Sequence, residues 1–405
     1  MANVTIYSSA NHWSYSDLYS TNFNDARVNS YSGSYISASA GGFSISATGS
    51  FYYDSYGLSG GTFNSLSMSY GSSQIVTASG FSLNVSDLAY GSPSSIEQRL
   101  LSGSDTIVSA WAQGDSYRTF GGDDRIELGT GNDTVDGGTG TDTFVVSVHS
   151  STASISTTSS GFRIDSSYGR DSLKNVEIVA FTDATVSLLK GGSSNETLTG
   201  DRVAVALPDY ISGGAGDDTI DGGRGEDFLF GDAGADVLIG KESGDSLYGN
   251  AGSDRLLGGA GSDLLNGANG ADTLLGGNKA DKIYGGRGKD ALSGGKGADV
   301  MVAGNGKDTL KGGAGDDLMT GGKGADTFVF QNKFGDDVIT DFGARNSNEK
   351  IDLSSVTQIK HWNDLANNHM EQAANGTDVV ISQGGNSITL VGVDLADLGA
   401  NDFLF

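Results

Sequence analysis

The chain of 405 residues contains no cysteine and only two prolines. The absence of cysteine excludes disulfides and thiolate metal sites, so the fold must be stabilised in another way. The two prolines are too few for a proline-rich linker. They are also too few for a collagen-like segment, although the chain contains 64 glycines. No apolar run reaches the roughly 18 residues of a membrane-spanning helix, and the first residues lack both a basic region and an apolar core. We therefore expect neither a transmembrane segment nor a cleavable N-terminal signal.

Basic residues are also scarce, because 24 Lys and Arg face 50 Asp and Glu, which gives a formal net charge of -26. Nucleic acid and anionic membranes are themselves negative, so this balance excludes both as electrostatic partners. High acidity alone usually indicates only solubility. In this chain, however, the acids recur at a fixed period.

A nine-residue repeat fills residues 213–329, which divide into 13 nonapeptides without insertion or deletion. The pattern is Gly-Gly-x-Gly-x-Asp-x-apolar-x, with aspartate at the sixth position and an apolar residue at the eighth position throughout. The sixth-position aspartates are Asp218, Asp227, Asp236, Asp245, Asp254, Asp263, Asp272, Asp281, Asp290, Asp299, Asp308, Asp317 and Asp326.

A shorter block of the same kind lies within residues 102–145. Asp115, Asp124, Asp133 and Asp142 follow one another at nine-residue intervals, although glycine is sparse before Asp115. The block is therefore a degenerate copy of the main array.

The remaining segments are expected to be β structure. Residues 1–101 alternate polar and apolar residues with period two, which favours a Ser/Tyr-rich β domain. The sequence does not indicate the role of this domain. Residues 146–212 predict an intervening β capping segment, and residues 330–405 predict a C-terminal cap with one short helix near Trp362 to Ala374.

The nonapeptide divides into a six-residue loop and a three-residue strand. Glycines at positions one, two and four permit positive φ and let backbone carbonyls crowd toward one point. Alternate side chains of a strand face opposite sides, so the eighth residue points inward. Two nonapeptides make one coil, and equivalent loops recur every 18 residues. The sequence thus predicts an all-β fold built on a parallel β-roll, with aspartates stacked on two sides.

Stacked carboxylates about 4.8 Å apart repel by roughly 1 kcal/mol in water and by about 3.5 kcal/mol at an effective dielectric of 20. Ordering nine residues costs on the order of 9–18 kcal/mol, whereas one buried Leu or Ile returns only ~1.5–3 kcal/mol. We therefore expect the roll to need a divalent cation. Oxygen ligands in flexible geometry favour calcium over magnesium.

The stacked aspartates give six adjacent pairs on one side and five on the other, hence up to about eleven calcium ions in the main roll. The short block adds one or two. Ser243 and Lys279 replace glycine at the fourth position, so their loops are expected to bind weakly or stay empty.

The nonapeptides resemble the RTX (repeats-in-toxin, haemolysin-type calcium-binding) repeat over residues 213–329 and, less fully, over residues 119–145. The resemblance implies that the sixth-position aspartates, with Asp124, Asp133 and Asp142, bind calcium together with loop carbonyls. It also implies export by type I secretion machinery from a Gram-negative bacterium, with residues 397–405 as an uncleaved signal. Folding would then follow outside the cell, at its surface or in the medium.

Few motifs suggest catalysis. The four histidines form no His-Glu-x-x-His pattern, and His361 and His369 are better explained as structural. Residues 57–61 match Gly-x-Ser-x-Gly, but that motif needs a strand-to-helix turn. The sequence thus favours a protein that is not an enzyme.

The ninth position carries apolar residues that should face outward. They are Phe230, Tyr248 and Tyr284 on one sheet, and Ile239, Leu257 and Leu275 on the other. Stacking along the sheet explains them, and so does a docking stripe for another molecule.

The favoured function is a secreted calcium-binding protein of a surface layer, biofilm matrix or adhesive surface, which associates with itself or with a cell-surface partner. One alternative is a secreted polysaccharide- or lipid-acting enzyme with an RTX module. The other is a host-directed or membrane-active effector, which the lack of long apolar helices disfavours.

Overall fold

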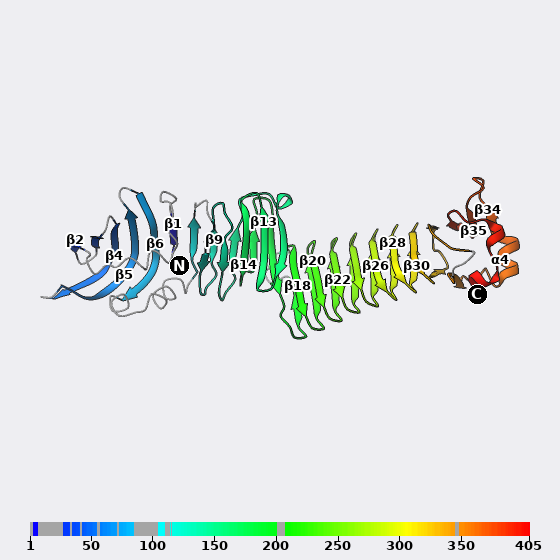
Figure 1. Cartoon of the computed structure of the whole chain (residues 1–405), viewed down its shortest axis with the longest axis horizontal. Helices are drawn as coiled ribbons and strands as arrows, with labels where there is room; N and C mark the ends of the chain where they lie inside the picture. Colours follow the sequence, from blue (N-terminus) through cyan, green and yellow to red (C-terminus); the bar gives the residue numbers. More distant parts are fainter. Residues whose placement is uncertain are drawn as a thin grey trace. The chain divides into compact units, whose positions relative to one another are not determined.

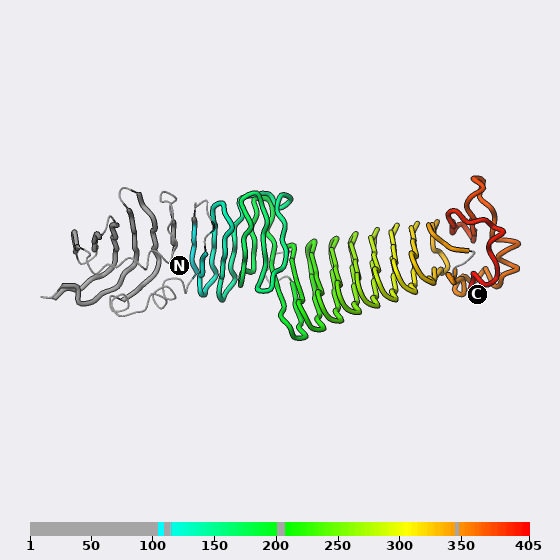
Figure 2. Tube along the Cα trace, viewed as in Figure 1, coloured from blue at the N-terminus to red at the C-terminus, as the bar shows by residue number. Residues whose placement is uncertain are grey.

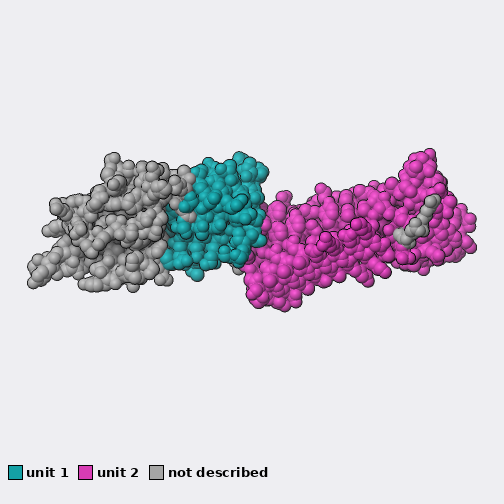
Figure 3. All heavy atoms as spheres, in the orientation of Figure 1, with its two compact units in different colours: residues 1–188 teal, residues 189–405 magenta. Residues whose placement is uncertain are grey.

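The computed structural model describes residues 104–109, 114, 116–200, 207–344 and 348–405, together with the backbone of six strands between residues 3 and 84. The chain divides into two compact units, an N-terminal unit of residues 1–188 and a C-terminal unit of residues 189–405 (Figure 3). Nearly all the described regular structure is β-strand, so the all-β prediction is confirmed.

The first part of the N-terminal unit is described by its strands alone. They are β1 (Asn3–Ile6), β2 (Arg27–Ser32), β3 (Tyr35–Ala40), β4 (Phe43–Asp54), β5 (Gly57–Tyr70) and β6 (Ser73–Asn84). Strands β2 to β6 pair antiparallel in chain order, and β1 pairs antiparallel with β6 and parallel with β7 (Thr106–Ser109).

The second part of the N-terminal unit is a short parallel roll. Its strands are β7, β8 (Ser116–Arg118), β9 (Arg125–Glu127), β10 (Thr134–Asp136), β11 (Thr143–Val145), β14 (Gly169–Lys174) and β15 (Ile178–Ala180). Parallel pairing joins β7, β9, β11 and β15 on one side, and β8, β10 and β14 on the other.

Within residues 146–190, antiparallel elements are added to this roll. A 3-10 turn, η2 (Ser150–Thr152), leads into β12 (Ser154–Thr158) and β13 (Gly161–Ser166), and β13 pairs antiparallel with β14. Strand β16 (Thr185–Lys190) pairs antiparallel with β15. The side chains of Ile126, Val135, Phe144, Leu173 and Val179 form the buried interior.

The C-terminal unit contains the main parallel β-roll, whose regular coils follow one another in Figures 1 and 2. One sheet holds β17 (Thr197–Thr199), β19 (Thr219–Arg224), β21 (Val237–Glu242), β23 (Arg255–Ala260), β25 (Thr273–Asn278), β27 (Ala291–Lys296), β29 (Thr309–Ala314), β31 (Thr327–Gln331), β33 (Lys350–Ser355) and β37 (Phe403–Leu404). We call it the odd sheet.

The facing sheet, called the even sheet, holds β18 (Asp209–Ala215), β20 (Phe228–Ala233), β22 (Ser246–Ala251), β24 (Leu264–Asn269), β26 (Lys282–Gly288), β28 (Val300–Gly306), β30 (Leu318–Gly324), β32 (Asp336–Ile339) and β36 (Asn386–Leu390). Neighbouring repeat strands pair in parallel, 18 residues apart, as in Phe230 with Tyr248. Most strands are six residues long, because the first residues of the next loop also pair, as in Asp232 with Asn250.

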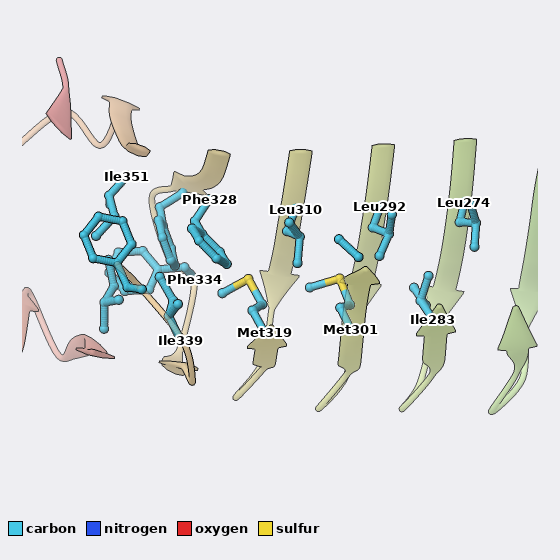
Figure 4. Close-up of a cluster of buried hydrophobic side chains, with 14 of the residues drawn as sticks. Leu274, Ile283, Leu292, Met301, Leu310, Met319, Phe328, Phe334, Ile339 and Ile351 are labelled. Carbon is cyan, nitrogen blue, oxygen red and sulfur yellow. The ribbon is translucent and has the colours of Figure 1, made fainter. Parts of the chain in front are cut away.

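The eighth-position side chains form the core of the main roll. They are at most 2% exposed from Ile220 to Phe328. Figure 4 shows Leu274, Leu292 and Leu310 from the odd sheet alternating with Ile283, Met301 and Met319 from the even sheet. A single layer of apolar side chains thus fills the space between two sheets.

A cap closes the C-terminal end of the roll. Phe328, Phe330 and Phe334 pack at its base, with ring centroids of Phe330 and Phe334 5.3 Å apart. The cap also contains α4 (Trp362–Asn368), β34 (Met370–Gln372), β35 (Val379–Gln383), η3 (Leu395–Asp397) and η4 (Ala400–Asp402).

One expectation meets a different outcome here. The helix predicted to reach Ala374 ends at Asn368, because Met370–Gln372 pairs antiparallel with β35 instead. The Gly-x-Ser-x-Gly match at residues 57–61 lies inside strand β5, not at a strand-to-helix turn. Among the described residues, no helix has both the length and the apolar character needed to cross a membrane.

Candidate calcium sites

The sixth-position aspartates line up as two ladders, one beside each sheet. The first ladder, beside the odd sheet, is Asp218, Asp236, Asp254, Asp272, Asp290, Asp308 and Asp326. The second ladder, beside the even sheet, is Asp227, Asp245, Asp263, Asp281, Asp299 and Asp317.

One hydrogen bond repeats along both ladders. The backbone N–H of each aspartate donates to Oδ1 of the aspartate 18 residues later, at 2.8 Å from Asp236 to Asp254 and 2.9 Å from Asp272 to Asp290. Every rung is therefore attached to its neighbour through one carboxylate oxygen.

The other carboxylate oxygen, Oδ2, is buried and accepts no hydrogen bond from any described residue. This holds for Asp218, Asp236, Asp245, Asp254, Asp263, Asp272, Asp281, Asp290, Asp299, Asp308, Asp317 and Asp326. A buried charged oxygen without a partner is costly, so such a long regular series needs an explanation.

The glycine at the first position supplies the space that these oxygens face. A Cβ placed on Gly231 would lie 2.5 Å from Oδ2 of Asp236 and 2.9 Å from the carbonyl oxygen of Gly249 in the next coil. A carboxylate oxygen and a carbonyl oxygen thus converge where only glycine leaves room. Among the described residues, no group of three or more His, Asp or Glu side chains surrounds one point, so carbonyls must complete any metal site.

This donor set fits calcium, which accepts six to eight carboxylate and carbonyl oxygens in flexible geometry. Burial raises the pKa of Asp236, Asp272 and Asp308 to about 6. It raises the pKa of Asp245, Asp281 and Asp317 to about 7. The neighbouring carboxylates on the same ladder contribute a smaller rise. The ionised ladders are consequently unfavourable unless positive charge accompanies them.

Two loops depart from the glycine pattern, as the sequence indicates. Ser243 and Lys279 both adopt φ of 75°, the left-handed conformation that glycine supplies at the same position of other loops. The Lys279 ammonium also opposes the rise that burial imposes on the pKa of Asp263. Weak or absent calcium binding at these loops stays a prediction.

Both ladders continue beyond the repeats. In the second ladder, Asp209 donates its N–H to Oδ1 of Asp227, and Asp317 donates to Oδ1 of Asp337, 20 residues later. In the first ladder, Glu196 donates its N–H to Oδ1 of Asp218, 22 residues later. The N–H of Lys350 donates to the carbonyl of Asp326, which puts Glu349 at the next rung.

The sequence reasoning missed these four acids because their loops lack the glycine pattern. A signal was nevertheless present, since each begins the motif acid-x-apolar-x that every repeat strand shares. The apolar residue of that motif is Ile211 after Asp209 and Ile339 after Asp337, and both are fully buried.

The short block has the same arrangement. Asp124, Asp133 and Asp142 are at most 3% exposed, and the N–H of Asp124 donates to Oδ1 of Asp142 at 2.9 Å. Asp115 lies outside the described residues. Asp171 and Glu177, which the sequence did not indicate as calcium ligands, accept hydrogen bonds from the N–H groups of Asp133 and Asp142.

The ninth-position residues lie as neighbours along each sheet. Phe230 stacks on Tyr248 with ring centroids 5.0 Å apart, and Tyr210 lies 4.8 Å from Phe230. Asn266 separates Tyr248 from Tyr284. On the odd sheet, Ile239, Leu257 and Leu275 are adjacent and half-buried. These side chains therefore stack along each sheet. Their use as a docking stripe stays a prediction.

The two histidines of the cap make local contacts. His361 accepts a hydrogen bond from the Asp364 N–H at the start of α4, and Nδ1 of His369 lies 2.8 Å from the carbonyl oxygen of Ser382. No described acid or histidine cluster joins them into a metal site.

The nonapeptide repeats match a known family of repeats. The family model described as RTX calcium-binding nonapeptide repeat (4 copies) matches residues 119–146, 206–238, 230–265, 239–274, 266–301 and 293–328. No curated protein matches the chain.

Three solved structures are similar to parts of the chain. Two subunits of the mannuronan C5-epimerase of Azotobacter vinelandii are 30% and 29% identical, over 32% and 31% of this chain and 79% and 88% of theirs, with TM-scores of 0.28 and 0.26. An extracellular lipase of Serratia marcescens is 16% identical over 75% of this chain and 38% of its own, with a TM-score of 0.20.

The matched residues are the same two blocks whose aspartates form the ladders. These two blocks therefore contain several copies of the RTX calcium-binding nonapeptide repeat.

Proposed function

We propose that this calcium-binding protein is secreted and folds when it meets calcium outside the cell, where it serves as a non-enzymatic component of a surface layer, biofilm matrix or adhesive surface. The observation that carries the proposal is the series of buried Oδ2 atoms that accept no hydrogen bond from described residues. Bound calcium would supply the positive charge and the oxygen coordination that these atoms need.

The ladders support folding that depends on calcium. Adjacent rungs lie one strand spacing apart, about 4.8 Å, so their repulsion is about 3.5 kcal/mol at an effective dielectric of 20. Each nonapeptide contributes one buried apolar side chain, such as Leu265, worth ~1.5–3 kcal/mol. The repulsion is thus as large as the apolar contribution, and a calcium-poor cytosol would leave the roll unfolded.

The C-terminal residues support export before folding. Strand β37 pairs parallel with β33, as in Phe403 with Ile351, and Phe403 is only 4% exposed. The Trp362 ring lies 5.6 Å from that of Phe403. If residues 397–405 are the type I signal that the family resemblance implies, the folded protein engages that signal, whereas the unfolded chain leaves it accessible to secretion machinery.

The outer surface of the even sheet supports a role in association. Phe228 is 44% exposed, Tyr284 37% and Leu318 39%, although they belong to a strongly acidic chain. Contiguous exposed apolar patches mark surfaces that contact other molecules, and we propose that these side chains contribute to one such patch. The partner proposed here is another copy of the chain or a component of the cell surface.

Calcium titration of the full chain tests this function. Circular dichroism should report a gain of β structure as calcium rises, and sedimentation should report association once the roll is formed. Full β structure in excess chelator would refute calcium-dependent folding.

Association has its own test. Tyr248→Lys combined with Tyr284→Lys should leave calcium-dependent folding intact and reduce the sedimenting assemblies. Unchanged assembly would mean that the outer surface of the even sheet does not form the contact between molecules. Turnover of polysaccharides or esters, or dye release from liposomes, would favour an enzyme or a membrane-active effector instead.

A further inference from the structure

The short repeat block ends at Asp142, and the chain then leaves the nonapeptide pattern. Residues 146–174 form η2 and the strands β12 to β14. The chain returns to the short roll at β14, which pairs parallel with β10, and then at β15, where Ile178 pairs with Thr143 of β11. The rung after Asp142 is therefore supplied by residues that belong to no repeat.

Backbone contacts identify Glu177 as that rung. In the main roll, Asp236 donates its N–H to Oδ1 of Asp254, and its carbonyl accepts from the N–H of Arg255. In the short roll, Asp142 donates its N–H to Oε2 of Glu177 at 2.9 Å, and its carbonyl accepts from the N–H of Ile178 at 2.9 Å.

The space beside the loop glycine is also reproduced. In the main roll, Oδ2 of Asp236 and the carbonyl oxygen of Gly249 converge beside Gly231. In the short roll, a Cβ placed on Gly137 would lie 2.5 Å from Oδ2 of Asp142 and would collide with the carbonyl oxygen of Asn175. Asn175 adopts φ of 50°, so it takes a left-handed conformation with a residue other than glycine.

The chemistry of the convergence point favours a cation. Asp142 is fully buried, and its Oδ2 accepts no hydrogen bond from a described residue. Only Val176 separates Asn175 from Glu177, whereas four residues separate the first and sixth positions of a nonapeptide. The extra methylene of glutamate extends its carboxylate, which compensates for the shorter loop.

We propose that Asp142, Asn175 and Glu177 form a calcium site outside the nonapeptide pattern, with carboxylate oxygens from Asp142 and Glu177 and the carbonyl oxygen of Asn175 as ligands. This site would hold β15, and with it the antiparallel strands of residues 146–174, against the short repeat block. The inference rests on the proposed function, because it assumes that the ladders of this chain bind calcium.

Hydrogen exchange of the full chain, read on peptides covering residues 169–181 across a calcium titration, tests this site locally. In wild type, these amides should become protected as calcium rises, and magnesium should not replace it. Glu177→Gln should raise the calcium concentration for half-protection of this segment roughly tenfold or more, since it removes a ligand charge. The glutamine keeps an oxygen that accepts from the Asp142 N–H, so the hydrogen bond is preserved.

Glu127→Gln is the matched control, because Glu127 lies in β9 of the same block and its carboxylate is 3.6 Å from Arg125, not on a ladder. It should leave the midpoint of residues 169–181 unchanged, and both variants should leave the peptides of residues 213–329 unchanged. An unaltered midpoint in Glu177→Gln, or full protection of wild type in chelator, would overturn the site.

Two outcomes separate this inference from the proposed function. If peptides of residues 213–329 respond to calcium and those of 169–181 do not, only the additional site is wrong. If neither segment responds, the proposed function fails as well. Should Glu177→Gln stay unprotected at every calcium concentration, Asp142→Asn must still show a shifted midpoint, and a wild-type midpoint there would equally overturn the site.

Discussion

Replacing Asp272 by asparagine should change stability in opposite directions with and without calcium. Asp272 sits in the middle of the first ladder, where its Oδ1 accepts from the Asp254 N–H at 2.8 Å and its N–H donates to Asp290. Its Oδ2 is buried beside Gly267, facing the carbonyl oxygen of Gly285. Asparagine keeps the Oδ1 acceptor and puts an N–H donor where Oδ2 stood.

The magnitude without calcium follows from the pKa of this carboxyl. Burial raises that pKa from 3.8 to about 6, with smaller contributions from Asp290 and Asp254. At pH 7.5 the ionised side chain therefore costs the folded state about 3 kcal/mol, at 1.36 kcal/mol for each pKa unit. Asp272→Asn removes this cost, so in chelator the local free energy of unfolding should rise by up to about 3 kcal/mol.

With calcium, the effect of Asp272→Asn on stability should reverse in sign, because the variant loses a charged oxygen ligand between the neighbouring rungs Asp254 and Asp290. The calcium concentration for half-protection should rise about tenfold. The assay is hydrogen exchange at pH 7.5 on peptides covering residues 255–292 of the full chain, in chelator and across a calcium titration. Glu226→Gln, an exposed loop charge beside the second ladder, is the control and should show neither effect.

A variant that is no better protected than wild type in chelator would refute the reasoning, because it would mean that the Asp272 charge does not destabilise the calcium-free roll. Equal calcium midpoints in Asp272→Asn and wild type would refute its role as a ligand.

Three further predictions concern pH, one loop and the core. Burial raises the pKa of Asp281 and of Asp317 from 3.8 to about 7, so these carboxylates bind protons more tightly in the folded state than in the unfolded state. The calcium-free roll should therefore gain β structure as pH falls from about 7 toward 4. Circular dichroism in chelator measures this gain, and a loss of structure would contradict the prediction. With calcium, the same acidification should weaken binding, because the ligands must be deprotonated. Lys279→Gly should lower the calcium midpoint of peptides covering residues 258–284, because it removes a cation near Asp263 and relieves a φ of 75°; an unchanged midpoint would exclude both effects. Leu265→Ala, at a fully buried position, should cost about 2–5 kcal/mol in denaturant unfolding with calcium present, and a cost below about 1 kcal/mol would mean that the single apolar layer collapses around the cavity.

The tertiary structure corrected sequence expectations where pairing competes with local preference. Residues through Ala374 have a helical pattern, yet the helix stops at Asn368 because Met370–Gln372 finds a partner in β35. Backbone hydrogen bonds to a neighbouring strand outweigh the small helix preference of these few partly exposed residues. Such a partner lies beyond any local window of sequence.

The strict period of nine was enough to determine the roll, the inward eighth position and both ladders from Asp218 to Asp326. Each of these depends only on local geometry, since a strand alternates its side chains and every loop has the same length. The acids that extend the ladders, Asp337 and Glu177 among them, carry the acid-x-apolar-x motif, but only the tertiary structure assigns them to their rungs. They reach their rungs 20 and 35 residues after the preceding acid, and only the folded path of the intervening chain sets those separations.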